Sequence, residues 1–582
     1  MKRFSQIMRR MLSVICLLTV TIFVAHAENY LFRNGQSDYE IVVSKQASKT
    51  ERNAATEFQM YVQRIGRVTL PIVSAPTASR KHIFIGWQQQ LPGVLQQQPE
   101  TDDEGFVYYT VGNDLVIYGG SERGTMYGVF TFLERELGVH WLTSSVSQVL
   151  QQKKYELCAL SHAEQPVILN RLDFCYDALR HTDWTAHNLL NCQHRLTDGQ
   201  YGRLEAYWGI HTFHTLIPPE RYFSTHPEYF SIYQGKRSDK AQLCLSNSAM
   251  QKELVRNLKE VIRTTPGYWC YDVSQNDNKF PCECRKCQKL VKKYGGQSGA
   301  MLWFVNKVAA EVKKEFPQVL IGTFAYQYTR QAPKSNIRPA DNVVIRLCDI
   351  ECCMAHSLEE CEQNRSFVND MNEWRRIARR IYIWDYTTGF QHYLLPFPNF
   401  KTLAANYRYF KESNVIGIME EGAHDAPWSE FSELKQWMIA KLLWNPYQDT
   451  DSLAQVFINS YYGKAAPSVM QYYQLCQSLV HPDSHFTIGI NWKSTLYNDS
   501  FVADGLTLLR KAEAAAGNDK ETAKRVNRLT AQLYYLKFRK APAHSVADGT
   551  VKSLKNIMKT DSTIVREFGY TFDQLLKDTG YH

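Results

Sequence analysis

Residues 380–422, RIYIWDYTTGFQHYLLPFPNFKTLAANYRYFKESNVIGIMEEG, decide the fold. Two short apolar runs, Arg380–Trp384 and Asn414–Met419, are each followed by acidic residues and predict strands. Between them, after Pro398, apolar side chains recur at helical spacing, namely Phe400, Leu403, Tyr407 and Phe410. A strand, a helix and a second strand in this order predict a crossover unit with two parallel strands.

The same unit recurs through the middle of the chain. Further strands are predicted at Tyr268–Val273, Val319–Ala325 and Asn342–Cys348, with weaker patterns near Arg171–Cys175 and His211–Phe213. Five clear units in a region of this size favour an α/β fold of the (β/α)8 TIM-barrel type over a small doubly wound sheet. We place this barrel, the expected catalytic domain, at residues 165–447.

Two other regions flank the predicted barrel. Residues 28–150 alternate strand and helix patterns, including a helix at Glu51–Ile65 that Gly66 ends, and predict a small α/β domain. This region shows no cluster of acidic residues, so we expect it to contribute no catalytic group. After Asp449 the strand patterns stop, and residues 448–582 predict a helical C-terminal domain.

The first 27 residues have the pattern of an export signal. A basic start without acids (residues 1–11) is followed by an apolar run (residues 12–24) and by Ala25-His26-Ala27, a small–x–small cleavage pattern. The apolar run is shorter than the roughly 20 residues that span a bilayer. We therefore expect residues 1–27 to be a cleaved signal peptide. The mature protein is then periplasmic, cell-surface or secreted, with no membrane span.

The net charge excludes a nucleic-acid-binding protein, and the number of cysteines limits how they can pair. The formal charge of +9 includes four positive charges of the expected signal, and the remainder is modest for this length. A nucleic-acid partner would need Lys and Arg concentrated on one face, so we expect none. Of the 14 cysteines, Cys16 lies in the expected signal, which leaves an odd number. At least one thiol is therefore free, bound to a metal or paired with another chain.

Several carboxylates follow predicted barrel strands, where the C-terminal strand ends form the active-site rim. Glycoside hydrolysis needs two carboxyl groups across the scissile bond, one of them held protonated. A single acid at such a place can instead cap the next helix, but the set favours function over capping. The candidate catalytic residues are Asp277, Glu351, Asp385, Glu420 and Glu421, with Asp349 beside them. We assign Asp277 as the general acid, and Asp385, Glu420 or Glu421 as its partner.

Polar and aromatic residues near the same strand ends are candidates for sugar binding, because aromatic faces pack against sugar rings. They are His211, His214, Asn276, Tyr326, Arg346, Trp384 and Tyr386. The spacing of His211 and His214 also allows a metal site, although structural histidines are commoner.

Three cysteines lie close together in Cys282-x-Cys284-x-x-Cys287. They can form a structural disulfide, or hold a structural zinc if a fourth ligand comes from elsewhere. Cys348, Cys352, Cys353 and Cys361 follow a neighbouring strand and could reach this loop. Apart from such a zinc, we expect no cofactor.

Several short segments together resemble the domain of unknown function 4838 family of exported bacterial proteins. These are His226–Phe230 (HPEYF), Asn276-Asp277 with the cysteine run, Ile383–Tyr386, Pro396–Asn399 and Leu443-Trp444, within a stretch from about His211 to Tyr473. Residues 121–141, with the helix at Glu51–Ile65, resemble the non-catalytic N-terminal domain of α-glucuronidases and β-hexosaminidases. The resemblance implies that a glycosidase-type barrel follows.

The same resemblance bears on the catalytic acids. It implies that the acid after the fourth barrel strand lies at or near Asp277. The chain has Asp277-Asn278 where the hexosaminidase pattern has an Asp-Glu pair, which speaks against the substrate-assisted mechanism. The glucuronidase pattern, with carboxylates on later strands, is matched loosely by Glu351, Asp385 and Glu421.

Three functions fit these patterns. The leading one is a glycoside hydrolase that acts on a plant, host or microbial glycan. The alternatives are a non-catalytic glycan-binding protein on the same barrel, and a metal-dependent carbohydrate hydrolase that uses His211 and His214. Facing carboxyl groups favour the first, and strand-end acids all paired with Arg or Lys favour the second. The sugar, the linkage and the oligomeric state stay open at this point.

Overall fold

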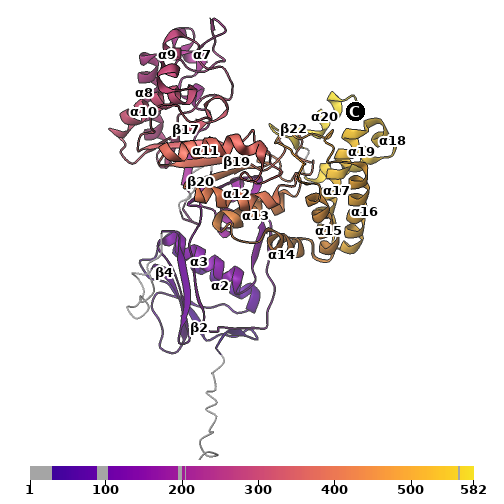
Figure 1. Cartoon of the computed structure of the whole chain (residues 1–582). Coiled ribbons are helices and arrows are strands. Elements are labelled where there is room, and N and C mark those ends of the chain that lie inside the picture. The colour runs from indigo at the N-terminus through magenta and orange to yellow at the C-terminus, as the bar shows by residue number, and fades with distance from the viewer. Residues whose placement is uncertain (1–28, 88–102, 194–198, 203–204, 562–563, 582) are drawn as a thin grey trace, which may run out of the picture.

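The computed structural model describes residues 29–87, 103–193, 199–202, 205–561 and 564–581. The expected signal peptide, residues 1–27, lies outside this part of the chain. Figure 1 shows the N-terminal domain below the strands of the central parallel sheet, and the C-terminal helices to one side of that sheet. In the part of the chain that the structure describes, no helix combines the length and the apolar character that a membrane crossing requires.

The N-terminal domain is built on a six-stranded sheet with the order β10-β5-β6-β4-β2-β3. Its strands are β2 (Tyr39–Val42), β3 (Ile72–Val73), β4 (Lys81–Trp87), β5 (Phe106–Val111), β6 (Asp114–Gly119) and β10 (Ser161–Glu164). Two small ladders accompany it, β1 (Tyr30–Arg33) with β9 (Lys154–Glu156), and β7 (His140–Thr143) with β8 (Val146–Gln148). Because β10 pairs with β5, the domain extends beyond the boundary that we predicted at residue 150.

Two helices, α2 (Lys49–Gly66) and α3 (Glu122–Arg135), pack against each other beside this sheet. Helix α2 begins with a capping box, in which the Ser48 side chain accepts from the backbone of Glu51 and the Glu51 side chain accepts from the backbone of Ser48. A glycine is required where β6 meets α3, because a Cβ atom on Gly119 would lie 2.2 Å from the backbone of Gly124. Helix α2 confirms the helix that we predicted at Glu51–Ile65.

Eight parallel strands form the curled central sheet. They are β11 (Asn170–Phe174), β12 (Cys192–Gln193), β13 (Glu205–Trp208), β16 (Cys270–Asp272), β17 (Leu320–Ala325), β18 (Val343–Cys348), β19 (Ile381–Tyr386) and β20 (Val415–Glu421). Their order, β11-β20-β19-β18-β17-β16-β13-β12, follows the chain around a ring, as in a (β/α)8 barrel. The end strands β11 and β12 are bridged by Asn191, whose Oδ1 accepts from the backbone N–H of Arg171 at 2.8 Å. The predicted fold class is confirmed.

Helices connect most of these strands. They are α4 (Tyr176–Arg180), α5 (Thr182–His187), α6 (Phe213–Leu216), α7 (Pro219–Tyr222), α8 (Ser248–Thr264), α9 (Arg285–Tyr294), α10 (Gln297–Lys313), α11 (Arg365–Ile377), α12 (Phe400–Glu412) and α13 (Ser432–Trp444). A small hairpin, β14 (Ile232–Tyr233) and β15 (Lys236–Arg237), lies between α7 and α8.

Two details of these connections depart from the predicted pattern. Strands β17 and β18 are joined through a single 3-10 turn, Gln327–Thr329. The strand expected near His211–Phe213 ends earlier, at Trp208, because Gly209 turns the chain with a φ of +75° and Phe213 already begins α6.

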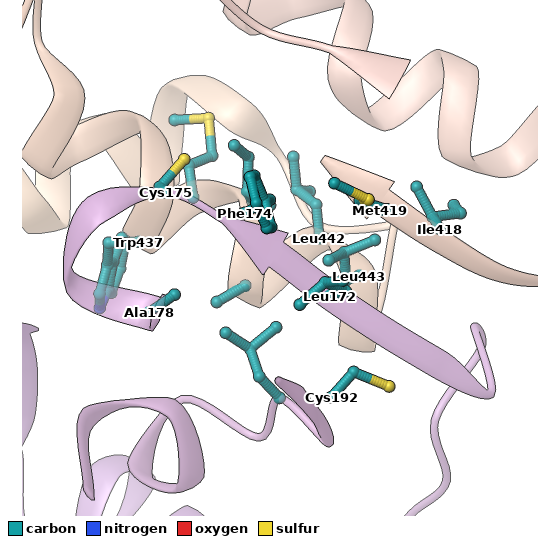
Figure 2. Close-up of a cluster of buried hydrophobic side chains, with 14 of the residues drawn as sticks. Leu172, Phe174, Cys175, Ala178, Cys192, Ile418, Met419, Trp437, Leu442 and Leu443 are labelled. Carbon is teal, nitrogen blue, oxygen red and sulfur yellow. The ribbon is translucent and has the colours of Figure 1, made fainter. Parts of the chain in front are cut away.

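The core beside β11 shows how the domains pack. Figure 2 shows Leu172 and Phe174 of β11 among Met419 of β20 and the α13 side chains of Leu442 and Leu443. Helix α13 is buried along its whole length, because it lies between the parallel sheet and its neighbours β7 and α14. Its last residues also reach the N-terminal domain, where the Trp444 ring stacks on the Phe106 ring with the centroids 5.9 Å apart.

The C-terminal region is mainly helical, as predicted. Its helices are α14 (Thr450–Tyr462), α15 (Ala466–Gln477), α16 (Asp499–Ala516), α17 (Lys520–Lys540), α18 (Pro542–Ala547), α19 (Thr550–Asp561) and α20 (Phe572–Asp578). A hairpin that we did not predict, β21 (Ile564–Arg566) and β22 (Tyr570–Thr571), precedes α20. Its turn has positive φ at both Phe568 and Gly569, and a Phe at the first of these positions gives no Asn-Gly or Asp-Gly signal.

Candidate active site at the barrel rim

A cavity of about 820 Å³ lies at the C-terminal ends of the barrel strands. Barrel residues on its wall include His211, Asp277, Tyr326, Cys348, Trp384, Tyr386 and Glu421. The C-terminal region closes another side with Ile488, Gly489, Arg566, Glu567, Phe568, Tyr570 and Gln574. The position is the one at which active sites of this fold occur.

Glu421, the last residue of β20, is a buried carboxyl group on the cavity wall. The indole N–H of Trp384 donates to its Oε2 at 2.8 Å. Burial raises the pKa of Glu421 to about 7, although the hydrogen bond from Trp384 opposes this shift. A substantial fraction of Glu421 is therefore protonated at neutral pH, as a general acid requires.

Asp277 faces the same cavity from the exposed loop after β16. The hydroxyl of Tyr326 donates to its Oδ1 at 3.0 Å, and the Gln327 amide donates to that hydroxyl at 2.8 Å. The preceding residue, Asn276, is turned the other way, and its Oδ1 accepts from the backbone N–H of His214 at 3.1 Å. Asn276 thus shapes the loop and does not reach the cavity, against our expectation of a sugar contact.

The two predicted histidines diverge. His211 lines the cavity, and its Nδ1 lies 2.7 Å from the carbonyl oxygen of Gln275, so the tautomer with N–H at Nδ1 is favoured. Burial lowers the pKa of His211, which keeps the ring neutral near pH 7 and its Nε2 able to accept a hydrogen bond. His214 is not on the cavity wall. The proposed metal pair of His211 and His214 is therefore wrong, because α6 begins between them and turns the second away.

Aromatic rings form one wall. Trp384 and Tyr386 stack at 6.2 Å between centroids with an interplanar angle of 18°, and Tyr326 and Phe390 continue the wall. Arg346 lies beneath it with 1% exposure, and its guanidinium carbon is 3.4 Å from the centroid of the Tyr207 ring. In this position Arg346 supports the barrel interior and cannot contact a substrate, which corrects its predicted role.

Asp385 and Glu420 do not face the cavity, although they are neighbours of residues that do. Consecutive residues of a strand point to opposite sides. Since Trp384, Tyr386 and Glu421 point into the cavity, Asp385 and Glu420 point outward, toward the covering helices. There they lie with Asp349 and the hydroxyl of Tyr407 from α12.

Glu351 also departs from its predicted role. Its carboxylate is more than a third exposed and lies 2.7 Å from a guanidinium nitrogen of Arg330, which also pairs with Asp370 at 2.7 Å. This is an ion-pair network beside the cavity. Glu351 is therefore a structural partner of Arg330.

An acid–imidazole–acid group, whose two acids lie on the cavity wall, was not indicated by any sequence pattern. His424 Nε2 lies 3.8 Å from Glu421 Oε1 and 3.6 Å from Glu567 Oε1. Burial lowers the pKa of His424, but the hydrogen bond to Glu567 and the charge of Glu421 outweigh it, so the pKa is raised. A protonated His424 would stabilise a negative charge on Glu421. The three side chains also offer donor atoms within 4.8 Å of one another, close enough for a metal. Glu567 comes from the hairpin, far away in the chain, and only the fold reveals it.

Six of the cysteines belong to two clusters of possible metal ligands that lie off the cavity wall. No disulfide joins any of the cysteines that the structure describes. Cys282, Cys284 and Cys287 are joined by Cys244 as a fourth thiol. Cys353 and Cys361 do not reach that loop, contrary to the possibility raised above, and lie instead with His356 and His485. Both groups could hold a metal.

Comparisons with known proteins agree with this architecture. Residues 29–132 match the family described as glycosyl hydrolase family 67 N-terminus. A solved structure of a family GH115 4-O-methyl-α-glucuronidase, BtGH115A, with specificity for decorated arabinogalactans, is similar with a TM-score of 0.60 and 12% identity, over 90% of this chain and 76% of that one. This likeness shows that the chain has the fold of a glycoside hydrolase.

Two further solved structures are more distant. CpGH84B has a TM-score of 0.45 and 12% identity over 93% of this chain and 96% of that one. A GH138 enzyme targeting pectin rhamnogalacturonan II has a TM-score of 0.41 and 9% identity over 93% of this chain and 98% of that one. Neither likeness is close enough to carry an argument. No curated protein matches the chain. The family described as domain of unknown function (DUF4838) matches residues 141–474, more than half of the chain, and the protein belongs to that family.

Proposed function

We propose that the protein is a glycoside hydrolase in which Glu421 is the general acid and Asp277 its partner. One observation carries the proposal: these two carboxyl groups, distant in sequence, line one large cavity at the barrel rim. Two carboxyl groups in one site are what glycoside hydrolysis needs, one to protonate the leaving oxygen and one to serve the anomeric carbon.

The environments of the two groups suggest the roles. Glu421 is buried and its pKa is raised to about 7, whereas Asp277 is exposed at the rim. We therefore reverse the assignment made from the sequence, in which Asp277 was the acid. In the proposed step Glu421 gives its proton to the glycosidic oxygen as the bond to the anomeric carbon breaks. Asp277 then either attacks that carbon or removes a proton from the attacking water.

Groups beside Glu421 can stabilise the negative charge that develops on it in this step. After proton transfer Glu421 carries a negative charge, which the Trp384 N–H and a protonated His424 would stabilise. The wall of Trp384 and Tyr386 offers a flat aromatic face to a sugar ring.

A glycan with a uronic acid is the substrate class that we propose. The cavity wall includes the guanidinium of Arg566, and guanidinium groups bind carboxylates well. The likeness to an α-glucuronidase and to a family 67 N-terminal domain supports the same class.

A panel of aryl glycosides, including α-glucuronides, and of decorated plant polysaccharides tests the proposal. We expect the wild type to release sugar or aglycone from at least one member. Glu421→Gln and Asp277→Asn should each abolish most of that activity, while Asp385→Asn, whose carboxyl group faces the helices, serves as the matched control. Full activity in Glu421→Gln would refute the assignment. Binding without turnover across the panel would favour a glycan-binding protein.

A further inference from the structure

We propose that the protein binds a structural zinc ion through Cys353, His356, Cys361 and His485, and that this ion fixes one wall of the cavity. The first three ligands lie in the loop between β18 and α11, and His485 lies in the C-terminal region. Cys353 and Cys361 are buried, whereas His485 is exposed. The inference does not depend on the proposed enzymatic activity.

The distances match a tetrahedral zinc site. With Zn–S of about 2.3 Å and Zn–N of about 2.0–2.1 Å, a sulfur and a nitrogen ligand lie about 3.6 Å apart. Cys353 Sγ lies 3.4 Å from His485 Nδ1 and 3.8 Å from His356 Nδ1. Cys361 Sγ lies 3.7 Å from His485 Nδ1. Two thiolates with two imidazoles are also a common structural zinc set.

Neighbouring groups hold the ligands in a metal-binding orientation. His356 Nε2 lies 3.0 Å from the carbonyl oxygen of His481, so it carries the N–H and leaves the lone pair on Nδ1, the atom that faces Cys353. The backbone N–H of Cys353 donates to Asn364 Oδ1 at 2.7 Å, and the Asn364 amide donates back to the Cys353 carbonyl at 3.0 Å. Ligands that are oriented in this way by their neighbours are characteristic of metal sites.

The position of the site indicates its purpose. Residues 478–498, between α15 and α16, contain no helix or strand in the structure, yet they supply Ile488 and Gly489 to the cavity wall. Irregular segments of this length are uncommon in compact domains, and those that are ordered are usually functional. Besides the metal ligands, a backbone hydrogen bond from Met354 to Phe486, at 2.8 Å, joins this segment to the β18–α11 loop. A zinc ion at His485 would anchor it to the barrel.

A second zinc site at Cys244, Cys282, Cys284 and Cys287 rests on independent distances. Two thiolates on a tetrahedral zinc lie about 3.8 Å apart. Cys244 Sγ lies 3.8 Å from both Cys284 Sγ and Cys287 Sγ. A disulfide needs about 2.05 Å, so these separations fit the metal and not the staple. Cys284 is also the N-cap of α9, where its Sγ accepts from the backbone N–H of Cys287 at 3.4 Å.

This second ion would hold the loop that carries Asp277. Gln242, two residues before Cys244, accepts from the backbone N–H of Asn276 at 2.9 Å and donates to its carbonyl at 2.8 Å. Fixing Cys244 to the Cys282–Cys287 loop therefore fixes both sides of the segment around Asp277. Each thiol that binds zinc releases one proton, so the two sites together release six.

Metal analysis of the purified full-length chain tests both sites. We expect two zinc ions per chain in the wild type. His485→Ala and Cys284→Ser should each retain one zinc, and the double variant none. Cys352→Ser, next to Cys353 but outside the cluster, is the matched control and should retain two. A wild type that binds no added zinc would overturn both sites. A His485→Ala variant that keeps two zinc ions would overturn the first site, and a Cys284→Ser variant that keeps two would overturn the second.

A second measurement on the wild type does not depend on how the variants fold. With Co²⁺ in place of zinc, X-ray absorption should give an average of three sulfur and one nitrogen ligands per metal. Peptide mapping should find Cys353 and Cys361 reduced, and a Cys353–Cys361 disulfide would overturn the first site. Removing the metal with a chelator should make residues 478–498 a new site of proteolysis, and unchanged cleavage would contradict the anchoring role.

Discussion

Glu420 and Glu421 are adjacent in β20, but they point to opposite faces of the barrel wall. Glu421 faces the cavity, next to Trp384 and His424. Glu420 faces the covering helices and lies with Asp385, Asp349 and Tyr407. Burial raises the pKa of both glutamates, and the neighbouring charge of Asp385 raises that of Glu420 further. A raised pKa therefore does not identify a catalytic acid here. The two glutamates differ in access to the cavity, which only Glu421 has.

The outward-facing carboxyl groups form one buried cluster in which Asp349 and Glu420 favour the protonated form beside the charge of Asp385. Asp349, Asp385 and Glu420 are almost fully buried, and burial raises the pKa of each. Ionised carboxylates so close together and away from water would be costly, whereas protonated ones can donate hydrogen bonds to their neighbours. On this face the raised pKa values reflect burial and mutual repulsion, whereas on the cavity face Glu421 is accessible for the proton transfer that we propose.

The largest expected effect separates the adjacent glutamates by activity. Glu421→Gln removes the proton donor and should lower kcat/KM by about 10²- to 10⁴-fold on a substrate found in the panel. Glu420→Gln should stay within a few-fold of the wild type. Because Glu421 must be protonated, wild-type activity should fall as the pH rises through about 7. Equal losses in the two variants would mean that the faces are not functionally distinct.

The next effect concerns stability and pH. The folded-state pKa of Glu420 lies above its unfolded value, so its favourable contribution is complete below about pH 4 and is lost as the pH rises toward the folded pKa. The loss is at most about 1.4 kcal/mol per pH unit for each such group. Melting temperatures measured between pH 5 and pH 8 should therefore fall more steeply for the wild type than for Glu420→Gln. The exposed Glu513→Gln is the control, and its curve should follow the wild type. Parallel curves for Glu420→Gln and the wild type would show that Glu420 is ionised in the fold.

The smallest effect tests how far the cavity face extends into the hairpin. Phe568 lies on the cavity wall with 89% of its surface exposed and a φ of +65°, an uncommon backbone for a large side chain. Loss of a stacking ring should weaken substrate binding by about 1 kcal/mol, so Phe568→Ala should raise KM several-fold with little change in kcat. Tyr447→Ala, exposed and off the cavity, should change neither. A fall in kcat with unchanged KM would remove Phe568 from the binding surface.

Much of the fold could be predicted because strand and helix periodicities are local. The unit at residues 380–422 and the convergence of strand ends follow from local patterns, and Asp277 and Glu421 do line one cavity. We also proposed Trp384, Asp385 and Tyr386 together, although alternation in a strand cannot bring all three to one face. From this alternation, the sequence alone would have shown that Asp385 does not share the cavity face with Trp384 and Tyr386.

Other parts of the site had no readable signal. Cys244, His485 and Glu567 join their clusters from distant positions in the chain, and no pattern near them marks the partner. Their roles depend on how loops pack against one another, which spacing along the chain does not encode.

The β21–β22 hairpin has a consequence for how such a protein can diversify. It docks on the barrel loops through backbone hydrogen bonds from Tyr393 to Val565 and from Glu567 to Phe390, and through one from Gly569 to the Asp425 carboxylate. Its side chains border the cavity without belonging to any barrel strand. The stretch that supplies the proposed proton donor and the stretch that shapes the cavity mouth are therefore separate in the gene. Mutation of the hairpin can therefore reshape the cavity mouth while the strand that carries Glu421 is inherited unchanged, provided that Glu567, the hairpin residue beside His424, is kept.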